Sequence, residues 1–193
     1  MLSSASSSTE ALLRHNHQAL NSLRRRWLGV AMAYAVATLA GYLFLRTAWN
    51  EDAALRWLGL TILFASRPLW LLWRHLAENH RREDELLLPD LGYGNVTTLA
   101  RGWCIAAVGG FFLSPWPGGL LAWLPAGLYL VAVILDGIDG YLARITNHTT
   151  KLGETLDISL DAWGLLAAIL VAVWYGQLPV WYVPLGLSRE FFM

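Results

Sequence analysis

The sequence is poor in charge and in cysteine. Charged residues make up 15% of its 193 positions, and 14 lysines and arginines balance 14 aspartates and glutamates. A chain without net charge lacks the basic excess typical of nucleic-acid binding, so we expect no nucleic-acid partner. Cys104 is the only cysteine, which excludes a disulfide within the chain. We interpret Cys104 as a small apolar side chain within a helix.

Apolar residues, in contrast, are abundant and come in long runs. They account for 56% of the chain, and 11 residues are tryptophan. Several runs approach the ~20 apolar residues that a helix needs to cross a bilayer. Tryptophans lie near the ends of these runs, as they do in the aromatic belt of membrane proteins. The sequence therefore predicts an all-α integral membrane protein built as a helical bundle.

Composition divides the chain into four parts. Residues 1–26 are a polar tail, and residues 27–75 hold two membrane-spanning helices. Residues 76–94 form a charged connection with a surface helix before Pro89, and residues 95–193 hold the remaining apolar runs. Most lysines and arginines fall on one side of the membrane if each run crosses once. The positive-inside rule then predicts a multi-pass protein of the plasma or inner membrane with a cytoplasmic N-terminus.

Four aspartates stand at the inner edges of two successive apolar runs: Asp136, Asp139, Asp157 and Asp161. The first two are three residues apart and the last two are four apart, so each pair shares one face of a helix. An acidic residue at the centre of a membrane helix costs ~2.5–3.5 kcal/mol, and four neighbouring acids repel one another. A divalent cation is the simplest group that would hold them together, since Mg²⁺ prefers oxygen ligands and bridges to substrate phosphates. The predicted topology places all four at the cytoplasmic side.

Small and basic residues surround the two acidic pairs. Gly140 follows the first pair and Gly153 precedes the second, and neither has a side chain to keep a ligand at a distance. Arg144 lies one helical turn beyond Gly140, where its guanidinium can neutralise phosphate oxygens. We interpret His148, in the loop between the pairs, as a solvated residue, because an oxygen-rich magnesium site does not need an imidazole.

The fixed positions of this stretch read D-x-x-D-G-x-x-A-R, eight residues, then G-x-x-x-D-x-x-x-D. This pattern resembles the class I signature of the CDP-alcohol phosphotransferase (CDP-alcohol phosphatidyltransferase) family at each of its eight fixed positions. The resemblance implies a membrane transferase of phospholipid biosynthesis. Such an enzyme moves a substituted phosphoryl group, normally phosphatidyl, from a CDP-alcohol such as CDP-diacylglycerol to an acceptor alcohol and releases CMP.

The same resemblance implies roles for individual residues. It implies two Mg²⁺ or Mn²⁺ ions bound by Asp136, Asp139, Asp157 and Asp161. Asp161 is also implied to be the catalytic base that takes the proton of the acceptor hydroxyl. The CDP-binding residues are implied to be Gly140, Ala143, Arg144 and Gly153. Homodimerisation is a further expectation of this kind.

A second pattern precedes the acidic signature. Asn95, Thr98 and Arg101 recur every three residues and therefore share one face of a helix. They resemble the N-x-x-T-x-x-R opening of the family's first core helix, which implies a face near the nucleotide. The alternative from the residues alone is that Asn95 caps the helix and that Arg101 reaches the lipid headgroups.

The length of the chain falls short of the family's core. That core has six transmembrane helices, whereas residues 95–193 provide three and most of a fourth, and the last run, 178–193, is too short for a comfortable span. We therefore expect two N-terminal transmembrane helices followed by the first three to four helices of a six-helix core, truncated at its C-terminus.

Three other functions remain open from the sequence. The first is an intramembrane prenyltransferase that binds Mg-diphosphate through acidic pairs on well-separated helices. The second is an ion or proton transporter, in which acids form a relay through the membrane depth. The third is an inactive, truncated homologue that keeps the acidic motif.

Overall fold

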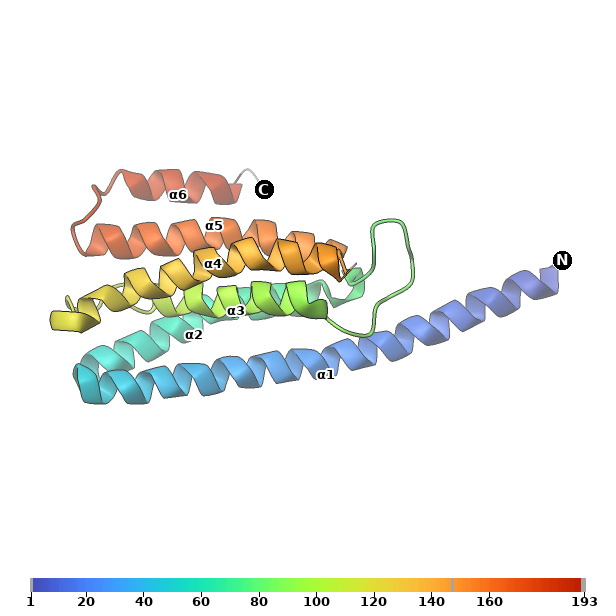
Figure 1. The fold of residues 1–193 in the computed structure, drawn as a ribbon, viewed down its shortest axis with the longest axis horizontal. Helices are drawn as coiled ribbons and strands as arrows, with labels where there is room; N and C mark the ends of the chain where they lie inside the picture. The colour runs from blue at the N-terminus through green and yellow to red at the C-terminus, as the bar shows by residue number, and fades with distance from the viewer. Residues whose placement is uncertain (1, 147, 192–193) are drawn as a thin grey trace.

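The computed structural model describes residues 2–146 and 148–191, and these ranges contain helices and connections but no strand. The described residues form six α-helices and two short 3-10 helices (Figure 1). In order they are α1 (Leu2–Ala48), α2 (Glu51–Arg74), η1 (Leu76–Glu78), α3 (Gly92–Gly109), η2 (Gly119–Trp123), α4 (Leu124–Ile145), α5 (Lys151–Trp174) and α6 (Tyr182–Phe191). The predicted all-α fold class is confirmed.

Three helical segments are long and apolar enough to cross a membrane, namely Leu12–Ala48, Gly119–Ile145 and Lys151–Trp174. Many large apolar side chains of the first two segments lie on the surface of the bundle, among them Met32 and Leu130. A helix that is apolar all round and still exposed is typical of a membrane span. The predicted surface helix before Pro89, in contrast, is wrong, because the residues after η1 form a loop without a further helix up to Gly92.

Helix α3 lies at the centre of the bundle and packs against α2, α4 and α5. Small residues along it allow this close approach. A Cβ atom added at Gly109 would lie 2.5 Å from Cδ1 of Phe64, and the indole nitrogen of Trp57 donates a hydrogen bond to the carbonyl of Ala107 (2.9 Å). This central helix therefore presents its side chains to α4 on one side and to α5 on another.

The first helix is a single long element that runs from the predicted tail into the membrane. Its N-terminal part extends beyond the other helices (Figure 1). Near this end it holds the loop that precedes α3. Asn16 donates to the carbonyl of Glu85 (3.1 Å) and accepts from the backbone nitrogen of Leu87 (3.0 Å). Ala19 and Leu23 pack in one apolar cluster with Leu87.

The loop before α3 folds back on itself around Asn79, whose side chain is completely buried. The amide nitrogen of Asn79 donates to the carbonyls of Leu88 (3.0 Å) and Asp90 (2.6 Å). These side-chain bonds compete with helical hydrogen bonding, which explains why no surface helix forms here. The loop also contacts the start of α5, where the backbone nitrogen of Lys151 donates to the carbonyl of His80 (3.1 Å).

Candidate active site

Two helices joined by a short link carry the four aspartates. Asp136 and Asp139 lie in the second half of α4, and Asp157 and Asp161 lie in the first three turns of α5. Thr150 caps the start of α5, since its hydroxyl accepts from the backbone nitrogen of Gly153 (3.1 Å). This cap ends the link and turns α5 back along α4, so that the two acidic pairs face each other.

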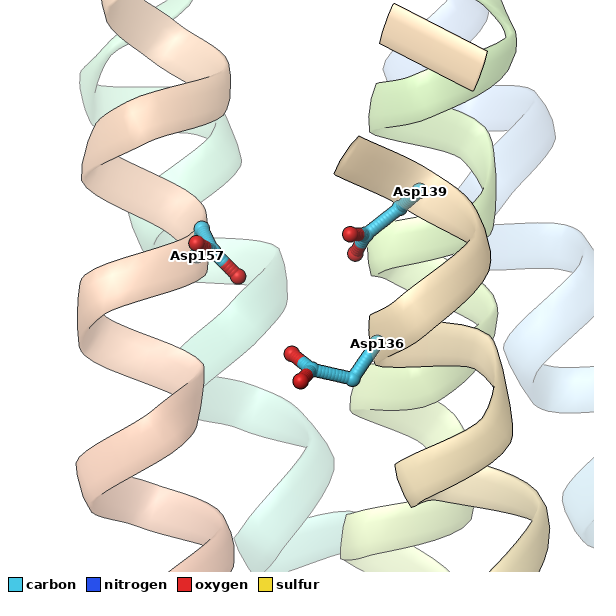
Figure 2. A group of neighbouring side chains, drawn as sticks. All are labelled: Asp136, Asp139 and Asp157. Atoms are coloured by element: carbon cyan, nitrogen blue, oxygen red, sulfur yellow. The ribbon is translucent and has the colours of Figure 1, made fainter. Parts of the chain in front are cut away.

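The carboxylates of Asp136, Asp139 and Asp157 point into the gap between α4 and α5 (Figure 2). One oxygen each of Asp136, Asp139 and Asp157 can be chosen such that the three atoms lie within 4.8 Å of one another. Mg²⁺ binds oxygens at about 2.0–2.1 Å, so small side-chain movements would bring these atoms onto one ion. The donor set is made of carboxylate oxygens, the ligands that hard cations prefer. This acidic cluster can therefore bind a divalent metal ion.

Arg101 reaches this cluster from α3, and its side chain is only 3% exposed. Its Nη1 atom pairs with Asp136 and lies 3.8 Å from Oδ2 of Asp139. Its Nη2 atom lies 2.9 Å from Oδ1 of Asp157 and 3.6 Å from Oδ1 of Asp161. The buried guanidinium therefore contacts all four carboxylates, which the sequence pattern alone did not indicate.

The other two residues of the predicted α3 face lie nearer the N-terminal end of the helix. Thr98 donates to Oδ2 of Asp139 (2.8 Å) and to the carbonyl of Gly94 (3.0 Å). Asn95 donates to the hydroxyl of Thr150 (3.2 Å) and is buried, so it links α3 to the start of α5 rather than capping its own helix. The face formed by Asn95, Thr98 and Arg101 thus runs along the acidic site, and its role toward a nucleotide stays a prediction.

A cleft of about 800 Å³ opens beside Asp139 and Asp157. Its walls include three of the four residues predicted to bind CDP, namely Gly140, Ala143 and Gly153. Arg144 is exposed and does not line the cleft, although its guanidinium lies near Gly140. The structure therefore brings the small signature residues to the cleft and leaves Arg144 at its edge.

Glycine is required where α3 meets α4 and α5. A Cβ atom at Gly94 would lie 2.9 Å from the Cβ of Ala143, and a Cβ atom at Gly153 would overlap Oδ1 of Asn95. We predicted Gly153 as a residue that lets a nucleotide approach, and in the structure it also lets Asn95 approach. The run of glycines at positions 92 and 94 is the sequence signal that could have indicated this close packing.

The interpretation of His148 as a solvated residue is wrong. Its side chain is 14% exposed and its Nε2 atom lies 3.5 Å from Oδ1 of Asp90. Gly92 has a φ of 67°, and a Cβ atom there would overlap the imidazole ring. His148 therefore packs against the turn that starts α3 and lines the cleft.

The connection before α3 supplies a wall of the cleft that the sequence did not predict. The wall consists of residues 81–84. Arg82 donates through Nε to Oε2 of Glu154 (3.2 Å) and pairs through Nη2 with Oε1 of the same side chain. No local pattern links these residues, because they are 72 positions apart in the sequence.

A second, smaller pocket lies on the other side of the acidic cluster. It measures about 190 Å³ and is lined by Asp136, Asp161 and Arg101 together with apolar side chains such as Ile105 and Leu160. The four aspartates therefore separate two spaces. The cleft meets Asp139 and Asp157, and the second pocket meets Asp136 and Asp161. We call it the inner pocket because its two aspartates lie farther from the link between α4 and α5.

Comparison with known proteins agrees with the geometry. The family model described as CDP-alcohol phosphatidyltransferase matches residues 92–193. A CDP-diacylglycerol–glycerol-3-phosphate 3-phosphatidyltransferase of Bacillus subtilis is 38% identical over 64 residues, which is 33% of each chain. The protein of the same name from Cereibacter sphaeroides is 31% identical over 86 residues, 43% of this chain and 37% of that protein.

A further relative is named for a different activity. Human ethanolaminephosphotransferase 1 is 52% identical over 42 residues, 21% of this chain and 11% of the human protein. The chain thus spans about a third of the two bacterial relatives and a smaller part of the human one. No solved structure matches the chain.

Proposed function

Because this chain belongs to the CDP-alcohol phosphatidyltransferase family, we propose that it transfers a substituted phosphoryl group from a CDP-alcohol to an acceptor alcohol and releases CMP. The observation that carries this proposal is the grouping of the signature residues around one site. Asp139 and Asp157 share a cleft with Gly140, Ala143 and Gly153, although Asp157 and Gly153 lie on α5 and the other three lie on α4.

The cleft is the proposed site of the nucleotide part of the donor. Its volume of about 800 Å³ falls within the range of ~300–1,000 Å³ that small-molecule sites occupy. Small side chains at positions 140, 143 and 153 leave room for the cytidine and its phosphates, and Arg144 at the edge can contact a phosphate oxygen. Two relatives are named for CDP-diacylglycerol, which supports this molecule as the donor and phosphatidyl as the transferred group.

The proposed metal ligands are Asp136, Asp139, Asp157 and Asp161. When bound, two Mg²⁺ or Mn²⁺ ions at these carboxylates would offset the charge of the diphosphate and of the departing CMP. Thr98 keeps the buried carboxylate of Asp139 in place through its hydrogen bond. The chain's own contribution is thus to hold four carboxylates at one depth of the membrane.

Asp161 is the proposed general base. Its side chain is 41% exposed and faces the inner pocket, on the far side of the cluster from the cleft. In the proposed reaction the acceptor oxygen forms a bond to the transferred phosphorus, and the bond from that phosphorus to the bridging oxygen of CMP breaks. CMP leaves with the bonding electrons, and Asp161 takes the proton of the acceptor hydroxyl.

The alternatives fit this arrangement less well. A relay for ions or protons would distribute its acids through the membrane depth, whereas oxygens of three of these aspartates lie within 4.8 Å of one another. A prenyltransferase would carry its acidic pairs on separated helices, whereas α4 and α5 follow one another directly.

The positive-inside rule supports a cytoplasmic N-terminus and a cytoplasmic site. We also propose that the protein forms homodimers, as the family resemblance implies.

The test is CMP release by the purified chain in detergent. CDP-diacylglycerol would be supplied with Mg²⁺, Mn²⁺ or chelator and with a panel of acceptors that includes glycerol 3-phosphate, serine and inositol phosphate. We expect CMP release that requires both a divalent cation and one acceptor. The same assay on any longer form of the reading frame shows whether further helices are needed. Release without any acceptor, or silence from both folded forms across the panel, would overturn the proposal.

A further inference from the structure

The guanidinium of Arg101 lies at the position where the two acidic pairs converge. Its two terminal nitrogens face the acidic pairs of two different helices. Nη1 faces the pair on α4, with Asp136 in contact and Asp139 at 3.8 Å, and Nη2 faces the pair on α5, at 2.9 Å and 3.6 Å from Asp157 and Asp161. Because Arg101 belongs to α3, one side chain connects three helices at this site.

The arrangement lets opposite charges compensate one another. Four carboxylates within reach of one another repel, and a buried arginine without a counter-charge is strongly unfavourable. Each group therefore satisfies the other, because every one of the four carboxylates lies within 4.0 Å of the guanidinium. The side chain also donates to the backbone carbonyl of Asp157 (3.1 Å), which fixes its position relative to α5.

A divalent cation would bind to the same carboxylate oxygens. The carboxylates that contact Arg101 include the three whose oxygens lie within 4.8 Å of one another. An ion placed among them would repel a guanidinium at this distance and would compete with it for the same negative charge. Nε and Nη1 of Arg101 are buried and have no hydrogen-bond partner among the described residues, so hydrogen bonds hold the guanidinium through Nη2 at Asp157.

We propose that Arg101 is a positioning residue that holds the four carboxylates together when no divalent cation is bound and is exchanged for the cation when one enters. This inference rests on the metal site of the proposed function. Arg101 thereby lets the acidic helices pack before metal arrives, and it sets how much free energy the metal must supply to replace it. Because the arginine competes with the ion, substitution of Arg101 should strengthen metal binding. The same substitution should destabilise the metal-free protein.

The experiment compares thermal unfolding of the purified chain and of two variants, Arg101→Gln and Arg101→Lys, in detergent. Each protein is measured in EDTA and then across a titration with MnCl₂, with tryptophan fluorescence as the readout. Arg46→Gln is the matched control, because Arg46 is exposed and pairs with Glu51 at the end of α1. Lysine keeps the charge but offers one nitrogen, which cannot face both acidic pairs as the guanidinium does.

We expect Arg101→Gln to unfold at a temperature at least about 5 °C lower than the wild type in EDTA. Mn²⁺ should raise its unfolding temperature by more than that of the wild type. Half of this rise should occur at a several-fold lower Mn²⁺ concentration. Arg101→Lys should lie between the two, and Arg46→Gln should behave as the wild type does. If Arg101→Gln does not fold, Arg101→Lys carries the same comparison. A variant that responds to Mn²⁺ no more strongly than the wild type would overturn the exchange.

The outcomes separate this inference from the proposed function. A wild type that responds to Mn²⁺, together with Arg101 variants that respond by the same amount, refutes the role of Arg101 and leaves the metal site standing. A wild type and variants that all ignore Mn²⁺ refute the proposed metal site and the exchange with it. Loss of CMP release alone decides neither, which is why unfolding is the primary readout.

Discussion

At the scale of single residues, the four aspartates are alike in chemistry and different in surroundings. Asp139 is 6% exposed and accepts a hydrogen bond from Thr98. Asp161 is 41% exposed and faces the inner pocket. A buried, hydrogen-bonded carboxylate is held in one orientation, whereas an exposed one can receive a proton from a substrate. The environments therefore support different proposed roles for the two residues.

The first prediction separates the base from the metal ligands. Asp161→Asn should reduce CMP release by at least ~10²-fold, the lower end of the contribution of a general base. It should reduce metal-dependent CDP binding less than Asp136→Asn does. Asp136 is proposed to act through the metal alone, whereas Asp161 is also the proposed base. CMP release and calorimetric CDP binding measure the two effects. Equal loss of CDP binding in both variants would contradict the role of Asp161 as the base.

The sequence could predict that these residues lie on two successive helices, because they form a local pattern, while their roles in the site stay predictions. The two acidic pairs, Gly140 and Gly153 lie within one stretch of the chain, and their spacing is enough to place them on two helices. Arg101 and Arg82 were different, since the carboxylates that they contact lie on helices far along the sequence. A pattern within one segment cannot show which remote side chain will fill the space beside it.

At the scale of secondary-structure elements, the contact between α3 and α5 depends on Gly153. Replacing it with alanine places a methyl group against Oδ1 of Asn95. We predict that Gly153→Ala destabilises the bundle by ~1–3 kcal/mol, the usual cost of overpacking. The matched control is Gly137→Ala, since a Cβ at Gly137 meets nothing within 4 Å. Chemical unfolding of both variants checks this, and equal stabilities would speak against the tight contact.

The loop between η1 and α3 gives a second prediction at this scale. Asn79→Ala removes the donor to the carbonyls of Leu88 and Asp90, which leaves buried groups unpaired at a cost of ~1–3 kcal/mol. We expect the loop to loosen, amide hydrogen exchange over residues 80–90 to rise, and CDP to bind several-fold more weakly. Asn21→Ala is the control, because Asn21 is exposed and its amide nitrogen lies 3.5 Å from Nδ1 of His17 on the same helix. Unchanged exchange over the loop after Asn79→Ala would argue against Asn79 as its anchor.

Helices themselves were predictable and their packing was not. The apolar runs indicated α1, α2, α4 and α5, because each run is long and bounded by charged or turn-forming residues. The connection before α3 has a composition suited to a surface helix, and tertiary hydrogen bonds of Asn79 and Asn16 overrode that preference. Local composition therefore determined where helices form in the membrane and failed where long-range contacts determine the backbone.

At the scale of the whole molecule, a loop outside the matched family region completes the wall of the cleft. The family model begins at residue 92, whereas residues 81–84 line the same cleft as Asp139 and Asp157. The N-terminal helices thus support a wall of the proposed nucleotide site through the loop that they hold. This contribution could not be derived from the family resemblance, which covers only the core.

The orientation of the molecule in the membrane gives the last prediction. Cys104 is 7% exposed, so an introduced cysteine can report its own accessibility to a membrane-impermeant maleimide. We predict that His17→Cys is labelled from the cytoplasmic side and Asp52→Cys from the opposite side, because basic residues favour the cytoplasm. Inverted and right-side-out vesicles provide the comparison. Labelling of both positions from the same side would refute the predicted crossing of the first helix.

The unbroken course of α1 has a mechanical consequence. Its 47 residues make a rod about 70 Å long at ~1.5 Å per residue, far longer than the ~30 Å hydrocarbon layer. The same rod that crosses the bilayer holds the cleft wall through Asn16. A helix longer than the hydrocarbon layer can tilt to accommodate the membrane thickness, and tilting a long, stiff helix displaces its far end more than its centre. A change of tilt would therefore reach the loop at the wall of the cleft through the hydrogen bonds of Asn16.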